Sequence, residues 1–240
     1  MSGVPAPPEP DVLDSLRRTS TATVSTQLLK RGLRTHYIEG VLPLNEAAAP
    51  FAAPAFTLRY IPAREDKAVP EVWADRTYPQ RKAIETVPEG WALVIDSMGD
   101  TRAGSVGDIL ALRLAKRGVA ALVTDGALRD TPVLAEMDFP VFCAGAAAPA
   151  SVVALFAADL QCPIGCGGAA VFPGDIVVGD AEGIVIVPRH LAEEVARDGA
   201  EQERLERFVH ARIEAGHSTF GTYPPDEATL AAYALWKEET

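Results

Sequence analysis

The stretch Gly104–Asp130, GSVGDILALRLAKRGVAALVTDGALRD, constrains the fold of this chain more than any other part of the sequence. Gly104 and Gly107 bracket a tight turn, and the apolar side chains that follow are spaced like one face of a helix that ends at Gly118. The apolar run Val119–Val123 is typical of a strand that is buried on both faces of a sheet. A loop, a helix, a strand and a second loop in this order, with a hairpin-rich second half, predict a layered α/β fold.

The start of this predicted helix is a candidate anion site. Because the helix begins near Gly107, the backbone N–H groups of Gly107, Asp108, Ile109 and Leu110 have no partner within the helix. Such N–H groups lie at the positive end of the helix dipole and bind carboxylate or phosphate. We therefore expect these four residues to form a substrate-binding turn.

Asp108, Arg129 and Asp130 are the candidate catalytic residues. Twenty residues separate Asp108 from Arg129, enough for a helix and a strand that return the chain to the same edge of the sheet. Carboxylates suit Mg²⁺ or Mn²⁺, and Mg²⁺ typically needs only one or two of them because it keeps several waters. Arginine binds a carboxylate through two parallel hydrogen bonds. Together these groups fit a site that polarises a 2-oxo acid and stabilises its enolate.

The same residues also allow a purely structural interpretation. Asp108 could complement the helix dipole, and Asp130 could cap a helix whose first turn holds Pro132. Arg129 could then pair with either carboxylate. Charged residues are common at loop ends, so the spacing alone does not decide between the two interpretations.

A family resemblance favours the catalytic interpretation. The pattern Gly-Asp, twenty residues, Arg-Asp resembles the signature of the RraA-like family, which includes the 4-hydroxy-4-methyl-2-oxoglutarate aldolases, class II pyruvate aldolases. VTDGALRD resembles the family's strand-and-loop segment, and a looser similarity runs from STATVSTQLLKRG at Ser20 to PGDIVVGDAEGIVIVP at Pro188. The resemblance implies a three-layer β/β/α swivelling fold, assembled as a trimer or a pair of trimers with active sites at subunit interfaces. Helical patterns add N- and C-terminal extensions.

The resemblance also implies a role for each site residue. Asp130 would ligate a divalent metal, Mg²⁺ or Mn²⁺, directly. Arg129 and the backbone of 107–110 would bind the oxo-acid end of the substrate, while Asp108 would hold metal-bound water and help to move protons. The implied activity is cleavage of a 4-hydroxy-2-oxo acid to pyruvate, and the same site could decarboxylate oxaloacetate. A neighbouring subunit would add a carboxylate from the C-terminal helix, for which the candidates are Glu201, Glu203 and Glu206.

Two other functions stay open. The family name also covers non-catalytic regulators that bind an RNA-processing endonuclease. A sugar-acid lyase or dehydratase would use the same metal site with a different pocket. The presence of Asp108, Arg129 and Asp130 favours an enzyme, because a protein-binding oligomer has no chemical need for a metal site.

The composition of the chain indicates which kinds of partner and which cellular compartment to expect. The 240 residues are 48% hydrophobic and 23% charged, an ordinary globular composition, and the net charge of −11 argues against a nucleic-acid partner. The sequence shows neither a signal-peptide pattern nor an apolar run long enough for a membrane span, so we expect a cytoplasmic protein. Cys143, Cys162 and Cys166 are too few and too odd in number for a disulfide framework, and buried thiols are expected.

The chain is predicted to consist of a tail, one domain and an extension. Residues 1–10 contain four prolines and are expected to form a flexible tail, residues 11–215 a single catalytic domain, and residues 216–240 a C-terminal extension. Residues 63–88 are polar and longer than a usual strand-to-helix connection. We expect an insertion or lid loop there, with Arg64 or Arg81 available for a second carboxylate; a solvated surface loop is the alternative.

Periodicity predicts the remaining elements. Helices are expected over residues 11–18, 21–29, 132–137, 151–158 and 189–215, with a last helix in the extension. Strands are expected over the half-buried stretch 51–61, over 91–98 and 139–143, and in a hairpin of 176–178 with 184–187.

Overall fold

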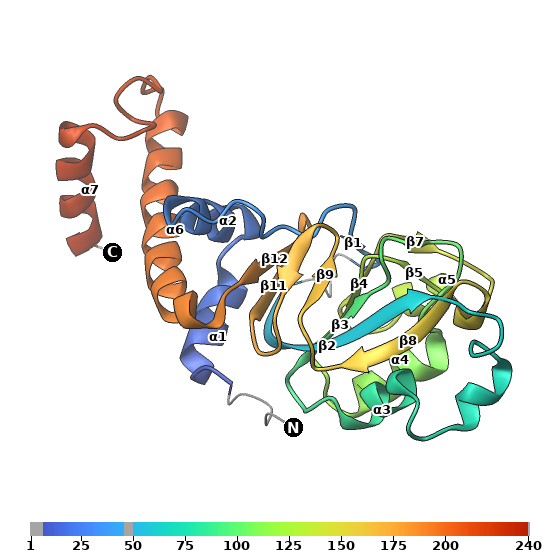
Figure 1. Ribbon diagram of the computed structural model, residues 1–240. Helices are drawn as coiled ribbons and strands as arrows, with labels where there is room; N and C mark the ends of the chain where they lie inside the picture. The colour runs from blue at the N-terminus through green and yellow to red at the C-terminus, as the bar shows by residue number, and fades with distance from the viewer. Residues whose placement is uncertain (1–6, 46–49, 240) are drawn as a thin grey trace.

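Four parallel strands form the centre of the molecule and fix the position of the loops that follow them. The computed structural model describes residues 7–45 and 50–239 (Figure 1). The parallel strands are β2 (Phe51–Pro62), β3 (Ala92–Asp96), β4 (Ala121–Thr124) and β6 (Val141–Cys143). Their carboxyl ends meet at one edge of the sheet, where ligands usually bind in folds of this type.

Antiparallel strands extend this sheet on both sides. Among the described residues it has eight strands in the order β1, β6, β4, β3, β2, β11, β12, with β8 also paired to β2. The added strands are β1 (Leu42–Pro43), β8 (Leu155–Leu160), β11 (Ile176–Asp180) and β12 (Gly183–Val187). The predicted hairpin is confirmed as β11 and β12, which pair from Ile176–Val187 to Asp180–Gly183.

Helices and short strands complete the chain. The helices are α1 (Pro10–Arg18), α2 (Thr21–Lys30), η2 (Pro70–Ala74), α3 (Pro79–Thr86), α4 (Asp108–Lys116), α5 (Thr131–Ala135), η3 (Ser151–Val153), η4 (Arg189–Leu191), α6 (Ala192–Glu214) and α7 (Glu227–Glu239). The short strands are β5 (Ala127–Leu128), β7 (Gly145–Ala146), β9 (Ile164–Cys166) and β10 (Ala169–Val171).

Two cores on opposite faces of the sheet make the three layers. Successive side chains of a strand point to opposite faces. Leu93 and Ile95 of β3 therefore pack with buried side chains of α3, α4 and α5. Ala92 and Val94 pack on the other side against β9 and β10. This arrangement confirms the predicted three-layer β/β/α fold.

The helical extensions cover the β11–β12 hairpin and then leave the domain. Leu16, Val24 and Leu28 of α1 and α2 share a third core with the hairpin and the start of α6. Helices α6 and α7 project away from the sheet, in orange and red in Figure 1. They pack on each other through Phe208 and Tyr233, whose rings lie 5.6 Å apart. The predicted extensions at both ends are therefore present.

Three expectations about the elements are wrong. Residues 151–158 form a single 3-10 turn and the strand β8 instead of a helix, because Phe156 pairs with Ile61 of β2. Residues 63–88 are only partly a loop, since they contain η2 and α3 and bury Tyr78 and Ile84 in the core, while most of residues 63–77 stay exposed or half-buried. Strand β2 is buried along most of its length rather than half-buried, because both faces of the sheet are covered.

Other expectations concern the ends, the membrane and the cysteines. Most of the expected tail over residues 1–10 lies outside the described residues, and Pro10 already begins α1. Within the described ranges, no helix is both long and apolar enough to cross a bilayer. Cys143 and Cys166 are buried thiols as expected, and Cys162 is partly exposed.

Candidate active site

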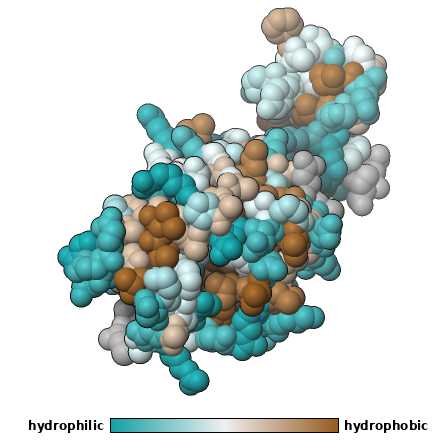
Figure 2. Space-filling model, turned by 90° about the vertical axis from the view of Figure 1, so that its right-hand side faces the viewer, coloured by the Kyte–Doolittle hydropathy of each residue, from teal (hydrophilic) through white to brown (hydrophobic). Residues whose placement is uncertain are grey.

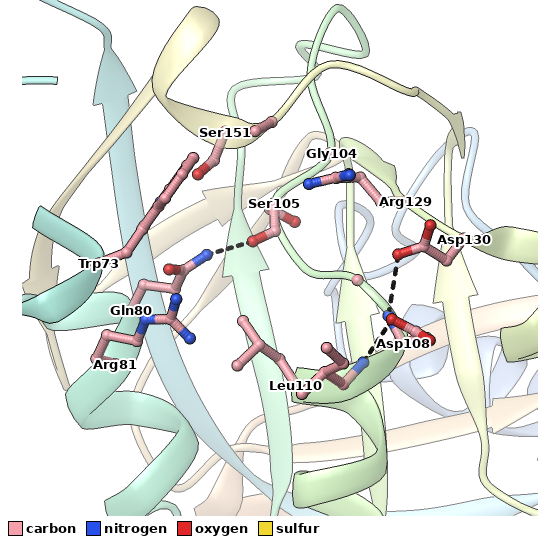
Figure 3. A pocket seen from close by; sticks show the side chains of 13 residues that line it. Trp73, Gln80, Arg81, Gly104, Ser105, Asp108, Leu110, Arg129, Asp130 and Ser151 are labelled. Atoms are coloured by element: carbon pink, nitrogen blue, oxygen red, sulfur yellow. Dashed lines mark hydrogen bonds between the residues drawn. The ribbon is translucent and has the colours of Figure 1, made fainter. Parts of the chain in front are cut away.

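A cavity of about 390 Å³ opens where the loops after β3 and β4 meet, and it brings the predicted site residues together (Figure 3). Its wall contains all six site residues predicted from the sequence, joined by others from η2, α3 and η3. The lining residues are Trp73, Gln80, Arg81, Gly104, Ser105, Gly107, Asp108, Ile109, Leu110, Arg129, Asp130, Ala150 and Ser151.

Gly104 allows the two loops to approach each other closely. It forms isolated bridges with Ala127 and Ala150, and its N–H donates to the carbonyl of Pro149 at 3.0 Å. A Cβ atom at this position would lie 2.5 Å from Cγ and 2.7 Å from the backbone nitrogen of Arg129. Only glycine fits such a contact. The close approach places Arg129 beside the start of α4.

Asp130 faces the start of α4 and not its own helix. It occupies the N-cap position of α5, yet its side chain makes no capping hydrogen bond. Its Oδ2 instead accepts a long hydrogen bond, 3.4 Å, from the N–H of Asp108. The backbone of Asp130 is left-handed, with φ 55° and ψ 32°, a conformation that costs about 1 kcal/mol in a non-glycine residue. Such outliers cluster at functional sites.

The start of α4 offers fewer open N–H groups to an anion than the sequence predicts. Of its four N–H groups, that of Asp108 is bound by Asp130 and that of Ile109 donates to Oδ1 of Asp108 at 2.7 Å. The N–H groups of Gly107 and Leu110 make no hydrogen bond with the described residues. These two groups therefore remain for a ligand.

Arg129 lies in the cavity wall with its Nε unpaired among the described residues. That atom is buried and makes no hydrogen bond with the described part of the chain. Asp108 and Asp130 bind backbone N–H groups rather than the guanidinium. Two parts of the structural alternative are therefore wrong, because Asp130 makes no capping hydrogen bond and Arg129 pairs with neither carboxylate. The third part is confirmed, since Asp108 lies in the first turn of α4. An arginine held in this way suits the carboxylate of a ligand.

Of the wall opposite Arg129, the sequence pointed to Arg81 alone, which it offered beside Arg64 for a second carboxylate. Gln80 is 3% exposed and donates from Nε2 to the carbonyl of Ser105 at 2.5 Å, which holds α3 against the loop after β3. Trp73 and Arg81 stand beside it, and Ser151 closes the upper side in Figure 3. Pro79 indicated a helix start, but nothing in one sequence placed that helix over the cavity.

The carboxylates fit a magnesium or manganese ion that keeps its waters. Within the residues that the structure describes, no three His, Cys, Asp or Glu side chains form a group able to hold a metal. Asp130 is exposed at the cavity and Asp108 adjoins it, a donor set of one or two carboxylates such as Mg²⁺ uses.

The three C-terminal glutamates bind groups of their own chain. Glu203 accepts from the hydroxyl of Ser20 at 2.8 Å, Glu201 accepts from Lys237 at 2.6 Å, and Glu206 accepts from Gln202 at 2.8 Å. None of them lines the cavity. A contribution to a neighbouring subunit's site stays a prediction.

Comparison with known proteins identifies the family. Residues 21–186 match the family described as RraA-like, Aldolase/RraA. The chain belongs to the RraA-like family. The structure of RraAS2 from Streptomyces coelicolor, an unusual member of the RNase ES inhibitor RraA protein family, is similar with a TM-score of 0.76 and 33% identity. The similarity covers 85% of this chain and 98% of RraAS2.

Two curated relatives differ in length from this RraA-like chain. A Halalkalibacterium halodurans protein, provisionally named a 4-hydroxy-4-methyl-2-oxoglutarate aldolase, is 33% identical over 138 residues, 56% of this chain and 65% of that protein. Protein DlpA of Legionella pneumophila is 26% identical over 86% of this chain. The matched region spans only 32% of DlpA.

Gly107 is expected to set the position of the Asp130 carboxylate in this RraA-like site. A Cβ atom on Gly107 would lie 2.7 Å from Oδ2 of Asp130, while the φ of −115° suits any residue. Gly107→Ala should therefore leave the fold intact, displace the carboxylate and weaken Mn²⁺ binding about tenfold, as is usual when a ligand loses its orientation. Titration calorimetry with Mn²⁺ measures this. Gly165→Ala, where the added Cβ meets nothing within 4 Å, is the control. Equal Mn²⁺ affinity in both variants would contradict the expectation.

Proposed function

We propose that this protein is a divalent-metal-dependent class II pyruvate aldolase that cleaves a 4-hydroxy-2-oxo acid, such as 4-hydroxy-4-methyl-2-oxoglutarate. The observation that supports this most is the meeting of Asp130, the start of α4 and Arg129 in one cavity. The name of the Halalkalibacterium halodurans relative points to the same reaction. Decarboxylation of oxaloacetate is proposed for the same site, because both reactions pass through the enolate of pyruvate.

Different residues of the cavity bind the substrate and the metal. Arg129 and the N–H groups of Gly107 and Leu110 bind the carboxylate and oxo oxygens of the substrate, since Nε of Arg129 and the two N–H groups have no acceptor among the described residues. Asp130 would hold a Mg²⁺ or Mn²⁺ ion, which would act as a Lewis acid towards the substrate. The donors face the atoms on which negative charge develops, which is how preorganised sites lower a barrier.

Asp108 assists removal of the proton from the C4 hydroxyl of the substrate. Its Oδ1 accepts from the Ile109 N–H, so the other oxygen is left to orient a water that takes the proton of the C4 hydroxyl. As that proton leaves, the C3–C4 bond breaks and its electron pair moves to C3, which gives the enolate of pyruvate. A proton added at C3 completes pyruvate. With 4-hydroxy-4-methyl-2-oxoglutarate, the other fragment is a second pyruvate.

We propose a homo-oligomer, a trimer or a pair of trimers, as the working form. Apolar side chains are exposed in the cavity wall, with Ile109 at 76%, and on η3 and α5, with Val153 at 67% and Val133 at 50%. Figure 2 views the side of the molecule that is on the right in Figure 1 and shows apolar patches among hydrophilic side chains. Such patches mark association surfaces. Sedimentation velocity tests the proposal, and a monomer at micromolar concentration would count against it.

A regulator of an RNA-processing endonuclease is the second candidate. It is supported by RraAS2, whose family is named for RNase ES inhibition. A pull-down with the endonuclease beside a Mn²⁺ titration separates the two candidates, because only the aldolase needs the metal.

Metal removal is the first test of the aldolase. Pyruvate release from 4-hydroxy-4-methyl-2-oxoglutarate and from oxaloacetate is measured by coupling to lactate dehydrogenase. We expect release with Mg²⁺ or Mn²⁺, a fall to the background rate in EDTA, and recovery when the metal is restored. Release that persists in EDTA would refute the metal-dependent mechanism. Absence of release with metal bound would refute this substrate class.

A further inference from the structure

A second hollow of about 680 Å³ adjoins the active-site cavity. It lies between η2, α3 and α4, and the two spaces share Trp73, Arg81, Ile109 and Leu110 as walls. A substrate whose 2-oxo acid lies at Arg129 would therefore extend past these four side chains into the hollow. The segment 63–88, which was expected to be an insertion, supplies most of its wall.

The hollow is cationic in an acidic protein. It is lined by Arg76, Arg81, Lys82 and Arg113, opposed by Asp75 and Glu85, so cations outnumber carboxylates by two. The whole chain carries −11. A local excess of positive charge against that background points to an anionic ligand.

The charges inside the hollow are only partly neutralised by each other. Arg113 forms an ion pair with Glu85 at 2.8 Å, and Asp75 accepts from the N–H and hydroxyl of Thr77 at 2.7 Å. The hydrogen bonds from Thr77 lower the pKa of Asp75. Arg81 has a buried Nε without a hydrogen-bond partner among the described residues. The cations left over are therefore on the α3 side, next to the passage from the cavity.

Apolar side chains line the way between the two spaces. Trp73, Ile109 and Leu110 belong to both walls, and Ile84 lies beneath the hollow. A carbon arm can lie against such side chains while its charged end reaches the arginines and the lysine. The arrangement suits a substrate that is acidic at both ends and apolar or hydroxylated in between.

We infer that the hollow binds an anionic group, phosphate or carboxylate, at the far end of the substrate's distal arm. The substrate would be a 4-hydroxy-2-oxo acid with at least two carbons between C4 and that group. The inference rests on the proposed function, and it assigns Arg76 and Lys82 as specificity residues that take no part in the chemistry. Cleavage breaks the C3–C4 bond as before, and the charged arm leaves on the aldehyde product.

Two matched substrate pairs test the hollow. The first pair is 4,5,6-trihydroxy-2-oxohexanoate with and without a 6-phosphate, and the second is 4-hydroxy-2-oxoheptanedioate beside 4-hydroxy-2-oxoheptanoate. We expect kcat/KM for pyruvate release to be at least about tenfold higher for the charged member of one pair, and the pair that shows it tells phosphate from carboxylate. Equal values within both pairs would overturn the inference.

Variants locate the effect in the hollow. In Arg76→Gln and Lys82→Gln, the preference for the charged member should fall about threefold to tenfold, while oxaloacetate decarboxylation stays within about twofold. Arg64→Gln is the matched control, because it removes an exposed cation of the same segment that pairs with Asp66 outside the hollow. An equal loss in Arg64→Gln would mean general attraction of anions and would overturn the inference.

Binding without turnover separates this inference from the proposed function. Titration calorimetry in EDTA, where no cleavage is expected, compares the affinities of the same substrate pairs for the wild type and Lys82→Gln. Tighter binding of a charged member that is lost in Lys82→Gln supports the hollow even if no substrate is cleaved. Decarboxylation of oxaloacetate without such a preference would contradict the inference about the hollow and leave the proposed aldolase function unaffected.

Discussion

Asp130→Asn is expected to lower metal-dependent pyruvate release by about three orders of magnitude, because the loss of a bound divalent cation removes several kcal/mol of transition-state stabilisation. Asparagine is the informative replacement. It tolerates the left-handed backbone that Asp130 adopts, whereas alanine would add strain of about 1 kcal/mol. The variant therefore removes one negative charge and little else, and its melting temperature should match that of the wild type.

The assay for Asp130→Asn needs both a rate and a metal titration. We expect calorimetry to show no Mn²⁺ binding in the range where the wild type saturates, and the coupled assay to show the background rate with both substrates. Asp138→Asn is the control, since it removes an exposed carboxylate after α5 that does not line the cavity. Wild-type turnover in Asp130→Asn would show that another residue holds the metal.

The central motif was predictable because its physical causes are local. Glycines set the turn before α4, apolar spacing set the helix, and a buried strand returned the chain to Arg129 and Asp130. Parallel pairing of β3 with β4 then places the two loops at one edge. Asp108, Arg129 and Asp130 therefore meet as the sequence predicts, and the family resemblance supplied the topology that the spacing could not.

Other parts of the site depend on contacts between segments far apart in the chain. Which N–H groups stay open at the start of α4 depends on the side-chain positions of Asp108 and Asp130, which spacing does not fix. Residues 151–158 were predicted as a helix, and pairing with β2 makes β8 instead. Gln80 lies at the cavity because its amide binds the carbonyl of Ser105, a contact across 25 positions.

Arg129→Met should impair every substrate alike, in contrast to the variants of the hollow. Arg129 is assigned to the 2-oxo acid end that all of these substrates share, and methionine has similar length without the charge. Truncating one side of a desolvated charged pair costs about 2 to 5 kcal/mol, so kcat/KM should fall roughly 30-fold to 5,000-fold. Arg129→Lys should recover little, because an ammonium cannot bind a carboxylate in the bidentate way.

The affinity of Arg129→Met for Mn²⁺ is the second quantity to measure. A guanidinium beside the metal site repels a divalent cation, so its removal should leave Mn²⁺ binding unchanged or make it tighter. Arg102→Met is the matched control, because this exposed arginine lies on the loop before the site and pairs with Asp100 at 2.6 Å. Loss of Mn²⁺ binding in Arg129→Met would mean that the arginine maintains the structure of the site. Unchanged kcat/KM with oxaloacetate would mean that Arg129 does not bind the substrate carboxylate. The N–H groups at the start of α4 would then be its binding site.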